Sequence, residues 1–120
     1  MNKTKDLMST FVNFVAQIHI FHWQSKKYAE HVALGSLYDG IQDLSDDFME
    51  VFIGNNDGAR AGSEDMIPGL FSLDVSSVGE VIFSFESFLK NMDVESTDLL
   101  NIRDEMLALV HKTQYLLTLS

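Results

Sequence analysis

Apolar residues recur every three or four positions in four separate stretches of this chain, which is the spacing of amphipathic helices. Polar and charged residues occupy the positions between them, and no stretch shows the strict alternation of a half-buried strand. The pattern therefore predicts an all-α protein with four helices. The predicted helices are residues 5–24, residues 29–53, a third from a cap at Asp74 or Ser76 to about Asn91, and a fourth from a cap at Ser96 or Thr97 to about Leu117.

The connections between these helices differ in length. Residues 54–73 break the helical periodicity with Gly54, with Gly62-Ser63 and with Pro68-Gly69, whereas the other two links are short. A single long connection is typical of ferritin-like bundles. A helix of ~20 residues is ~30 Å long, so this segment can cross the bundle and return the chain parallel. We therefore predict one domain over residues 1–120, a ferritin-like four-helix bundle with one long crossover between the second and third helices.

Two glycines, Gly35 and Gly40, lie inside the second predicted helix. Each weakens a helix by about 1 kcal/mol relative to alanine. Their presence indicates that this helix packs closely against a neighbour at these positions.

Composition and charge narrow the function. Eight Lys and Arg stand against eighteen Asp and Glu, giving a net charge of −10, so no nucleic-acid partner is expected. The chain has no Cys, which excludes disulfides, thiolate nucleophiles and Cys-ligated metals. No apolar run approaches the ~20 residues of a membrane span, and residues 1–6 lack the features of a signal peptide. We expect a cytoplasmic protein with no membrane partner, whose chemistry rests on histidines and carboxylates.

Three of the four histidines lie where the first two predicted helices meet. His19 and His22 are three residues apart and share a face of the first helix, while His31 opens the second helix. The short link should make His22 and His31 neighbours in space. Two interpretations follow: these side chains are half-buried hydrogen bonders near a helix end, or they are imidazole ligands of a metal site.

Two carboxylates, Asp46 and Glu50, share a face of the second helix. Like charges at this spacing destabilise a helix unless a cation offsets them, although a solvated acidic face is the simpler explanation. His31 and Asp46 point to the same side, because fifteen residues give a rotation of about 60°, but they lie ~22 Å apart along one helix. An antiparallel pairing of two copies would bring His22 and His31 of one copy to Asp46 and Glu50 of the other.

The motifs along the first two predicted helices are His22-Trp23, then Tyr28-Ala29-Glu30-His31, then Asp46-x-x-x-Glu50. Together they resemble the Dps-like branch of the ferritin superfamily. The resemblance implies an iron-oxidising site between two subunits, with His22 and His31 as ligands from one subunit and Asp46 and Glu50 as ligands from its partner. It implies that Trp23 lines the site, that the metal is iron, and that a homo-oligomer forms through the first two helices.

The chain departs from the family pattern in three respects. The family usually has an Asp four residues after the second-helix histidine, where this chain has Gly35, and Asp39 one turn farther on is the candidate replacement. The nine-residue interval between His22 and His31 is shorter than is usual in the family, which implies a trimmed link. The chain is also short, and it is similar to small divergent ferritin-like proteins of the kind that phages also encode.

A di-iron site at the centre of the bundle is not expected. Such a site takes Glu-x-x-His from each of two helices, and no Glu-x-x-His occurs in this chain. The fourth histidine, His111, is therefore expected to be structural or exposed.

Three hypotheses about function follow. The first is a Dps-like iron-binding protein that oxidises Fe(II) and stores Fe(III), since imidazole and carboxylate ligands suit iron. The second is a catalytically silent ferritin-like bundle with a structural or protein-interaction role, which the missing carboxylate at Gly35 motivates. The third is a helical adaptor, although four strong apolar stripes indicate that these faces are used internally.

Overall fold

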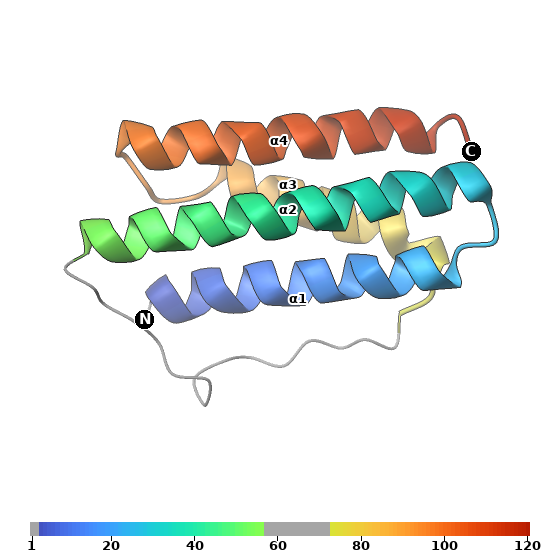
Figure 1. Cartoon of the computed structure of the whole chain (residues 1–120), viewed down its shortest axis with the longest axis horizontal. Coiled ribbons are helices and arrows are strands. Elements are labelled where there is room, and N and C mark those ends of the chain that lie inside the picture. The colour runs from blue at the N-terminus through green and yellow to red at the C-terminus, as the bar shows by residue number, and fades with distance from the viewer. Residues whose placement is uncertain (1–2, 57–72) are drawn as a thin grey trace.

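The computed structural model describes residues 3–56 and 73–120 of the chain, and these residues form four α-helices with no strand. The prediction of an all-α protein with four helices is confirmed. In Figure 1 the helices run roughly along a common axis as a four-helix bundle. The elements are α1 (Lys3–Gln24), α2 (Tyr28–Asn55), the short 3₁₀ turn η2 (Val75–Ser77), α3 (Val78–Lys90) and α4 (Thr97–Leu117).

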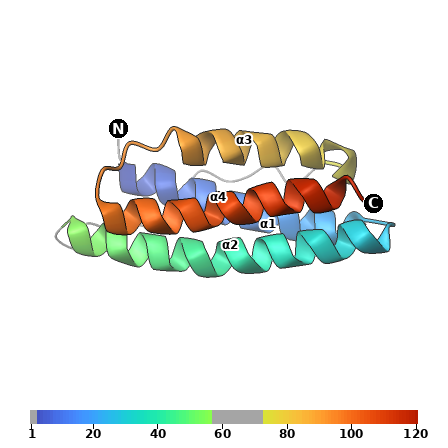
Figure 2. The same ribbon diagram turned by 90° about the horizontal axis from the view of Figure 1, so that it is seen from above.

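Contacts at the ends of the helices define their directions. At the start of α1, Lys3 Nζ lies 3.5 Å from a carboxylate oxygen of Asp93, which follows α3. At the end of α1, Gln24 Nε2 donates to the carbonyl oxygen of Leu73, which precedes η2, at 3.3 Å. α3 is therefore antiparallel to α1. Because the α1–α2 hairpin is also antiparallel, α2 and α3 run in the same direction (Figures 1 and 2).

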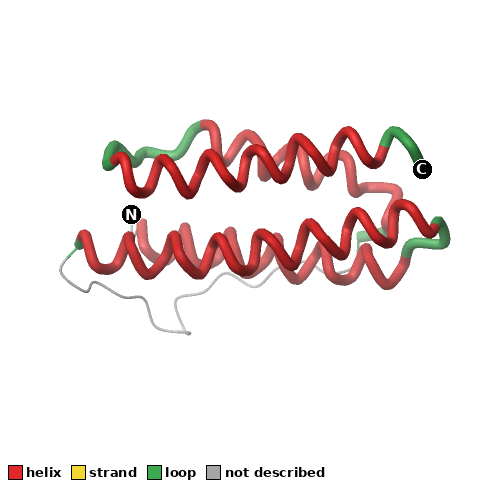
Figure 3. The backbone as a smooth tube through the Cα atoms, turned by 45° about the horizontal axis from the view of Figure 1, so that its top comes forward, coloured by secondary structure: helices red, strands yellow, loops and turns green. Residues whose placement is uncertain are grey.

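The end of α2 and the start of α3 therefore lie at opposite ends of the bundle, as expected from a long connection. Of the predicted turn residues, Gly62-Ser63 and Pro68-Gly69 lie outside the described residues. The other links are short, as the loops in Figure 3 show. Around the bundle, α1 packs on α2, α2 on α4, α4 on α3, and α3 on α1.

The apolar stripes meet in one core. Phe11 packs edge-on against Phe48, with ring centroids 5.5 Å apart, and Phe14 stacks on Phe85 at 3.8 Å. All four helices contribute, so each helix is stabilised mainly by burial of its apolar face. The buried residues of this core are Leu7, Phe11, Phe14, Ile18, Phe21, Leu34, Leu37, Ile41, Phe48, Phe52, Ile82, Phe85, Leu89, Leu99, Met106 and Val110.

The close packing predicted at the two α2 glycines is confirmed. A Cβ atom at Gly40 would lie 2.4 Å from Leu109 Cδ2 of α4, which is closer than carbon atoms pack. Gly40 therefore allows α4 to approach α2. Gly35 faces His22 instead, and its role belongs to the site described below.

The predicted helix ends are right to within a few residues, and Asp74 and Ser96 both occupy N-cap positions, as predicted. Asp74 caps as expected, since its carboxylate accepts a hydrogen bond from Val75 N at 2.8 Å, although η2 precedes α3. Ser96 occupies the N-cap position of α4, but its side chain makes no capping hydrogen bond. The Asp98 carboxylate instead accepts from Leu99 N at 2.8 Å. None of the helices in the described ranges is long and apolar enough to cross a membrane.

Candidate metal centre

The structure brings His22 and His31 together at the junction of α1 and α2. Their imidazole rings stack with centroids 3.7 Å apart and planes 16° from parallel. His22 Nδ1 lies 2.6 Å from the carbonyl oxygen of His31, and His31 Nδ1 lies 2.8 Å from the carbonyl oxygen of His22. The sequence prediction that these two residues are spatial neighbours is confirmed.

These reciprocal contacts determine which nitrogen of each ring carries the proton. A carbonyl oxygen can only accept, so each Nδ1 donates an N–H, and in the neutral ring Nε2 then holds the lone pair. Neither Nε2 has a hydrogen-bond partner among the described residues. Metal-ligating histidines commonly have this arrangement, with one nitrogen held by a carbonyl and the other left for the ion.

The link between the helices supports this geometry. Ser25 Oγ donates to Glu30 Oε1 at 2.5 Å, and Lys27 N donates to Ser25 Oγ at 3.3 Å. These hydrogen bonds connect the link to the first turn of α2. The carbonyl of His22 lies in the last turn of α1, where no helical N–H reaches it. The His31 ring supplies that missing donor. The interpretation of these histidines as hydrogen bonders at a helix end is therefore confirmed for Nδ1, and any role as ligands belongs to Nε2.

Asp46 and Glu50 form the second predicted pair, on the exposed side of α2. The pKa of Glu50 is raised above its ordinary value, chiefly by a side-chain hydrogen bond with Asp46 and then by the negative charge of Asp46. A raised carboxyl pKa means that the two carboxylates share a proton more readily than either would alone. A cation placed between them would relieve the same repulsion.

The two pairs do not meet within one copy of the chain. His31 and Asp46 are fifteen residues apart on the continuous helix α2, which is ~22 Å along its axis. Within the ranges 3–56 and 73–120, no three His, Cys, Asp or Glu side chains gather closely enough to hold a metal ion. One copy therefore presents a nitrogen pair at the α1–α2 junction and an oxygen pair farther along α2.

An aromatic cluster surrounds the histidine pair. His19 stacks on Tyr38 at 4.1 Å and lies 4.0 Å from Trp23, while the Tyr38 ring meets His22 edge-on at 5.5 Å. Trp23 is 68% exposed, so it borders the cluster from the solvent side. His19 is a neighbour of this site that spacing alone left without a role. Tyr38 lies on α2, and its contact with both His19 and His22 depends on how α1 and α2 pack.

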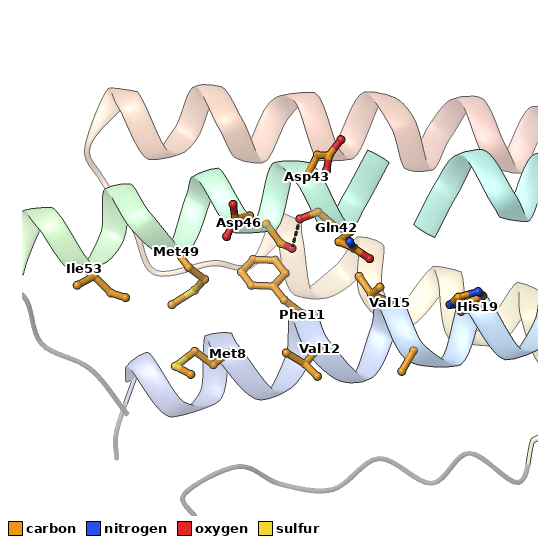
Figure 4. Close-up of a pocket in the computed structure, with 12 residues that line it drawn as sticks. Met8, Phe11, Val12, Val15, His19, Gln42, Asp43, Asp46, Met49 and Ile53 are labelled. Atoms are coloured by element: carbon orange, nitrogen blue, oxygen red, sulfur yellow. Dashed lines mark hydrogen bonds between the residues drawn. The ribbon is translucent and has the colours of Figure 1, made fainter. Parts of the chain in front are cut away.

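A groove of about 790 Å³ runs between α1 and α2 on the outer side of the bundle. Its walls are mostly apolar, and His19 lies toward one end while Asp46 lies on its α2 side (Figure 4). The apolar walls were not foreseen, because the apolar stripes were assigned to the core. The lining residues are Met8, Phe11, Val12, Val15, Ala16, His19, Gln42, Asp43, Ser45, Asp46, Met49 and Ile53.

His111 belongs to a separate cluster between α3 and α4. Its Nε2 lies 2.9 Å from Glu86 Oε2, Lys90 Nζ lies 2.9 Å from the same oxygen, and Gln114 Nε2 donates to Glu86 Oε1 at 3.0 Å. These hydrogen bonds, that of Gln114 foremost, lower the pKa of Glu86 to about 2. His111 is half exposed, and the prediction that it is structural or exposed is confirmed.

The fold and this geometry define a class: an all-α four-helix protein with a stacked histidine pair at the α1–α2 junction. Within that class, the chain belongs to DUF5856, a family of unknown function, which matches residues 22–117. The matched region contains His22, His31, Asp46 and Glu50. No curated protein and no solved structure matches the chain.

Proposed function

We propose that this protein is a ferritin-like, Dps-like protein that binds iron at a site shared between two copies of the chain. His22 and His31 of one copy and Asp46 and Glu50 of the other would be the ligands. The observation that carries the proposal is the histidine pair, in which both Nδ1 atoms are held by carbonyl oxygens and neither Nε2 atom has a partner within residues 3–56 and 73–120. The helix directions and the long crossover also agree with a ferritin-like bundle.

The proposal needs an antiparallel pair of copies, and the outer face of α1 and α2 favours one. Val12 is 57% exposed and Trp23 is 68% exposed on this face, beside the apolar groove. An exposed apolar patch of this kind is typical of a protein–protein interface. Two-fold packing of this face would place the histidine pair of each copy opposite the carboxylate pair of the other, since the two pairs lie at different positions along α2.

The donor set suits Fe(II) as the substrate. Neutral imidazole nitrogens and carboxylate oxygens together favour a borderline divalent ion over Mg²⁺ or Ca²⁺, which prefer oxygen alone. The carboxylates of Asp46 and Glu50 would neutralise the ion, and the histidines would orient it. Bound Fe(II) would then lose one electron to dioxygen or peroxide and become Fe(III), which the acidic surface of the chain would retain.

The test is the rate of Fe(II) oxidation by air, followed by the absorbance of Fe(III). We expect the wild type to exceed the background rate, and His31→Ala to lose at least about tenfold of that excess. His111→Ala is the matched control, because it removes an imidazole from the α3–α4 cluster and leaves the proposed site intact. Equal rates for the wild type, His31→Ala and buffer would exclude the proposed activity.

A catalytically silent interaction protein is the second candidate, and Gly35 favours it. The Dps-like pattern has a carboxylate at that position, so the chain offers one ligand fewer. This candidate uses the same α1–α2 face for association but no metal. It predicts a dimer whose thermal stability is unchanged by Fe(II) under nitrogen, whereas the iron-binding proposal predicts a higher Tm with Fe(II).

A further inference from the structure

We infer that Gly35 is a positioning residue: its missing side chain is the space in which the His22 imidazole lies, and this seat holds the histidine pair with both Nε2 atoms available. The inference rests on the proposed metal-binding function and says how this chain prepares its two nitrogen ligands. It also explains why a glycine persists in the middle of α2, where it weakens the helix.

The distances define the seat. A Cβ atom at position 35 would lie 2.9 Å from His22 Cε1, 3.2 Å from Nδ1 and 3.8 Å from Nε2. The distance to Cε1 is shorter than non-bonded carbon atoms approach in proteins, and the distance to Nδ1 is shorter than most contacts that a Cβ atom makes. Any side chain at this position therefore forces the His22 ring to move or α1 to move away from α2.

The His22 ring has little freedom to give way. Its Nδ1 is 2.6 Å from the His31 carbonyl oxygen, its face is stacked on His31, and its edge meets Tyr38. Moving the ring breaks the Nδ1 hydrogen bond, which is the contact that leaves the lone pair on Nε2. It also uncovers the His31 ring. A single methyl group at position 35 should thus disturb both ligands.

For the variant Gly35→Asp, the close contact between position 35 and His22 predicts the opposite change in metal affinity from the Dps-like pattern. In that pattern an Asp at position 35 is a ligand, so Gly35→Asp should tighten metal binding. In this structure, the Cβ of Asp would occupy the space of the His22 ring before its carboxylate could reach an ion. Gly35→Asp should therefore weaken metal binding, as Gly35→Ala should. Position 35 provides a ligand in the Dps-like pattern, whereas in this structure it must stay free of a side chain so that the His22 ring fits.

The experiment compares wild type, Gly35→Ala and Gly35→Asp with the matched control Gly79→Ala. Gly79 lies in the first turn of α3, and a Cβ there would meet nothing within 4 Å. Two readouts are taken. The first is the imidazole tautomer of metal-free, ¹⁵N-labelled protein at about pH 8, where imidazole is neutral. The second is the affinity for Co²⁺, measured by its visible absorption.

We expect His22 and His31 of the wild type and of Gly79→Ala to carry their protons on Nδ1. Gly35→Ala should lose this signature at His22 and bind Co²⁺ about tenfold more weakly, with unchanged helix content. Retention of both tautomers and full affinity in Gly35→Ala would overturn the inference, and so would tighter Co²⁺ binding by Gly35→Asp.

The two readouts separate this inference from the proposed function. If the wild type binds no Co²⁺, the iron-binding proposal loses its support. The tautomers then decide alone whether Gly35 seats His22: a change confined to the Gly35 variants supports the seat, and no change refutes it. If Co²⁺ binds with equal affinity to the wild type and Gly35→Ala, the proposed function stands and the seat does not.

Discussion

The imidazole rings of His22 and His31 are stacked 3.7 Å apart, and each ring donates its Nδ1 proton to the backbone carbonyl of the other residue. This exchange joins the last turn of α1 to the first turn of α2. It satisfies a carbonyl that a helix C-terminus otherwise leaves open. The same two hydrogen bonds that stabilise the junction thus select the tautomer that a metal ligand needs, so the structural role and the proposed ligand role use different nitrogens.

Self-association through the α1–α2 face is the first prediction. Val12 is 57% exposed on this face, so Val12→Asp should leave the fold of a single copy intact while placing a charge in the proposed interface. An unpaired buried charge costs about 3 kcal/mol, so the dissociation constant should rise by about a hundredfold. Sedimentation velocity or light scattering measures the change.

The matched control for this variant is Phe83→Asp. Phe83 is an apolar residue of α3 that is 65% exposed and does not line the α1–α2 groove. The wild type and Phe83→Asp should have the mass of a dimer or a larger oligomer, and Val12→Asp the mass of a monomer. A monomeric wild type would remove the shared site from consideration.

The repulsion between Asp46 and Glu50 should lower the stability of the metal-free protein while favouring the binding of a cation. Glu50→Gln removes one of two like charges, so the metal-free variant should have a higher Tm than the wild type at pH 7. The pKa of Glu50 is raised in the fold. Its contribution to stability is therefore present in acid, where the carboxyl is protonated, and is lost as pH rises through the folded pKa. The advantage of the variant should thus vanish in acid.

With Fe(II) present under nitrogen at pH 7, the Tm of the wild type should exceed that of Glu50→Gln, which is the reverse of the order expected without metal. The wild type should gain Tm from the bound ion, whereas Glu50→Gln should gain little. Glu105→Gln, an exposed position on α4, is the control and should respond to Fe(II) as the wild type does. An equal Fe(II) response in all three proteins would place the cation site elsewhere than at Glu50.

The Glu86 cluster should govern the acid stability of the α3–α4 pair. Hydrogen bonds from Gln114, Lys90 and His111 lower the pKa of Glu86 to about 2. A depressed carboxyl pKa gives stability that is present above the unfolded value, for which 4.5 is the reference, and that is lost as pH falls toward 2.

Glu86→Gln should therefore have a lower Tm than the wild type at pH 7, and the two should converge near about pH 2. Thermal unfolding followed by circular dichroism across this pH range measures the effect. Glu80→Gln, at an exposed position on the same helix, should follow the wild type throughout. A constant difference between Glu86→Gln and the wild type at every pH would contradict the assigned cause.

The contact between α2 and α4 at Gly40 gives a prediction about packing. A Cβ at this position would lie 2.4 Å from Leu109 Cδ2, so Gly40→Ala should destabilise the fold by about 1–3 kcal/mol. Helix propensity alone predicts the opposite sign, because alanine is favoured over glycine by about 1 kcal/mol. Urea unfolding distinguishes the two. The double variant with Leu109→Ala should recover part of the loss from Gly40→Ala, since the two sites are in contact.

The existence of the four helices could be predicted because helical periodicity is a local property of the chain. The stripe from Leu7 to Phe21 is almost wholly buried, as its spacing required. The parallel direction of α2 and α3 also followed from one link being long. By contrast, Ser96 occupies the predicted N-cap position but makes no capping hydrogen bond with its side chain, because a side chain that can cap can equally bond elsewhere. Its hydroxyl lies 3.5 Å from Asn55 Nδ2 instead.

The proximity of His22 to His31 could be predicted from the amino-acid sequence, because a link of only a few residues joins the two helix ends. The pairing of Asp46 with Glu50 was equally accessible, since helical geometry alone puts them on one face. The way in which the first pair is built depended on the fold. Which nitrogen donates, and why Gly35 has no side chain, follow from the rotation of α1 against α2, which hydrophobic spacing does not encode.

On the outer face of α1 and α2, too, some features follow from the sequence and others only from the tertiary structure. Apolar residues at helical spacing are expected to fill a core, but Val12 is 57% exposed and lines an open groove. Val12 follows Met8 at helical spacing, so only the positions of the neighbouring helices reveal that no element of the described chain covers Val12. Local periodicity therefore determined the helices and their apolar stripes. Tertiary packing decided which apolar residues stayed open and how the two histidines meet, because both depend on contacts between residues far apart along the chain.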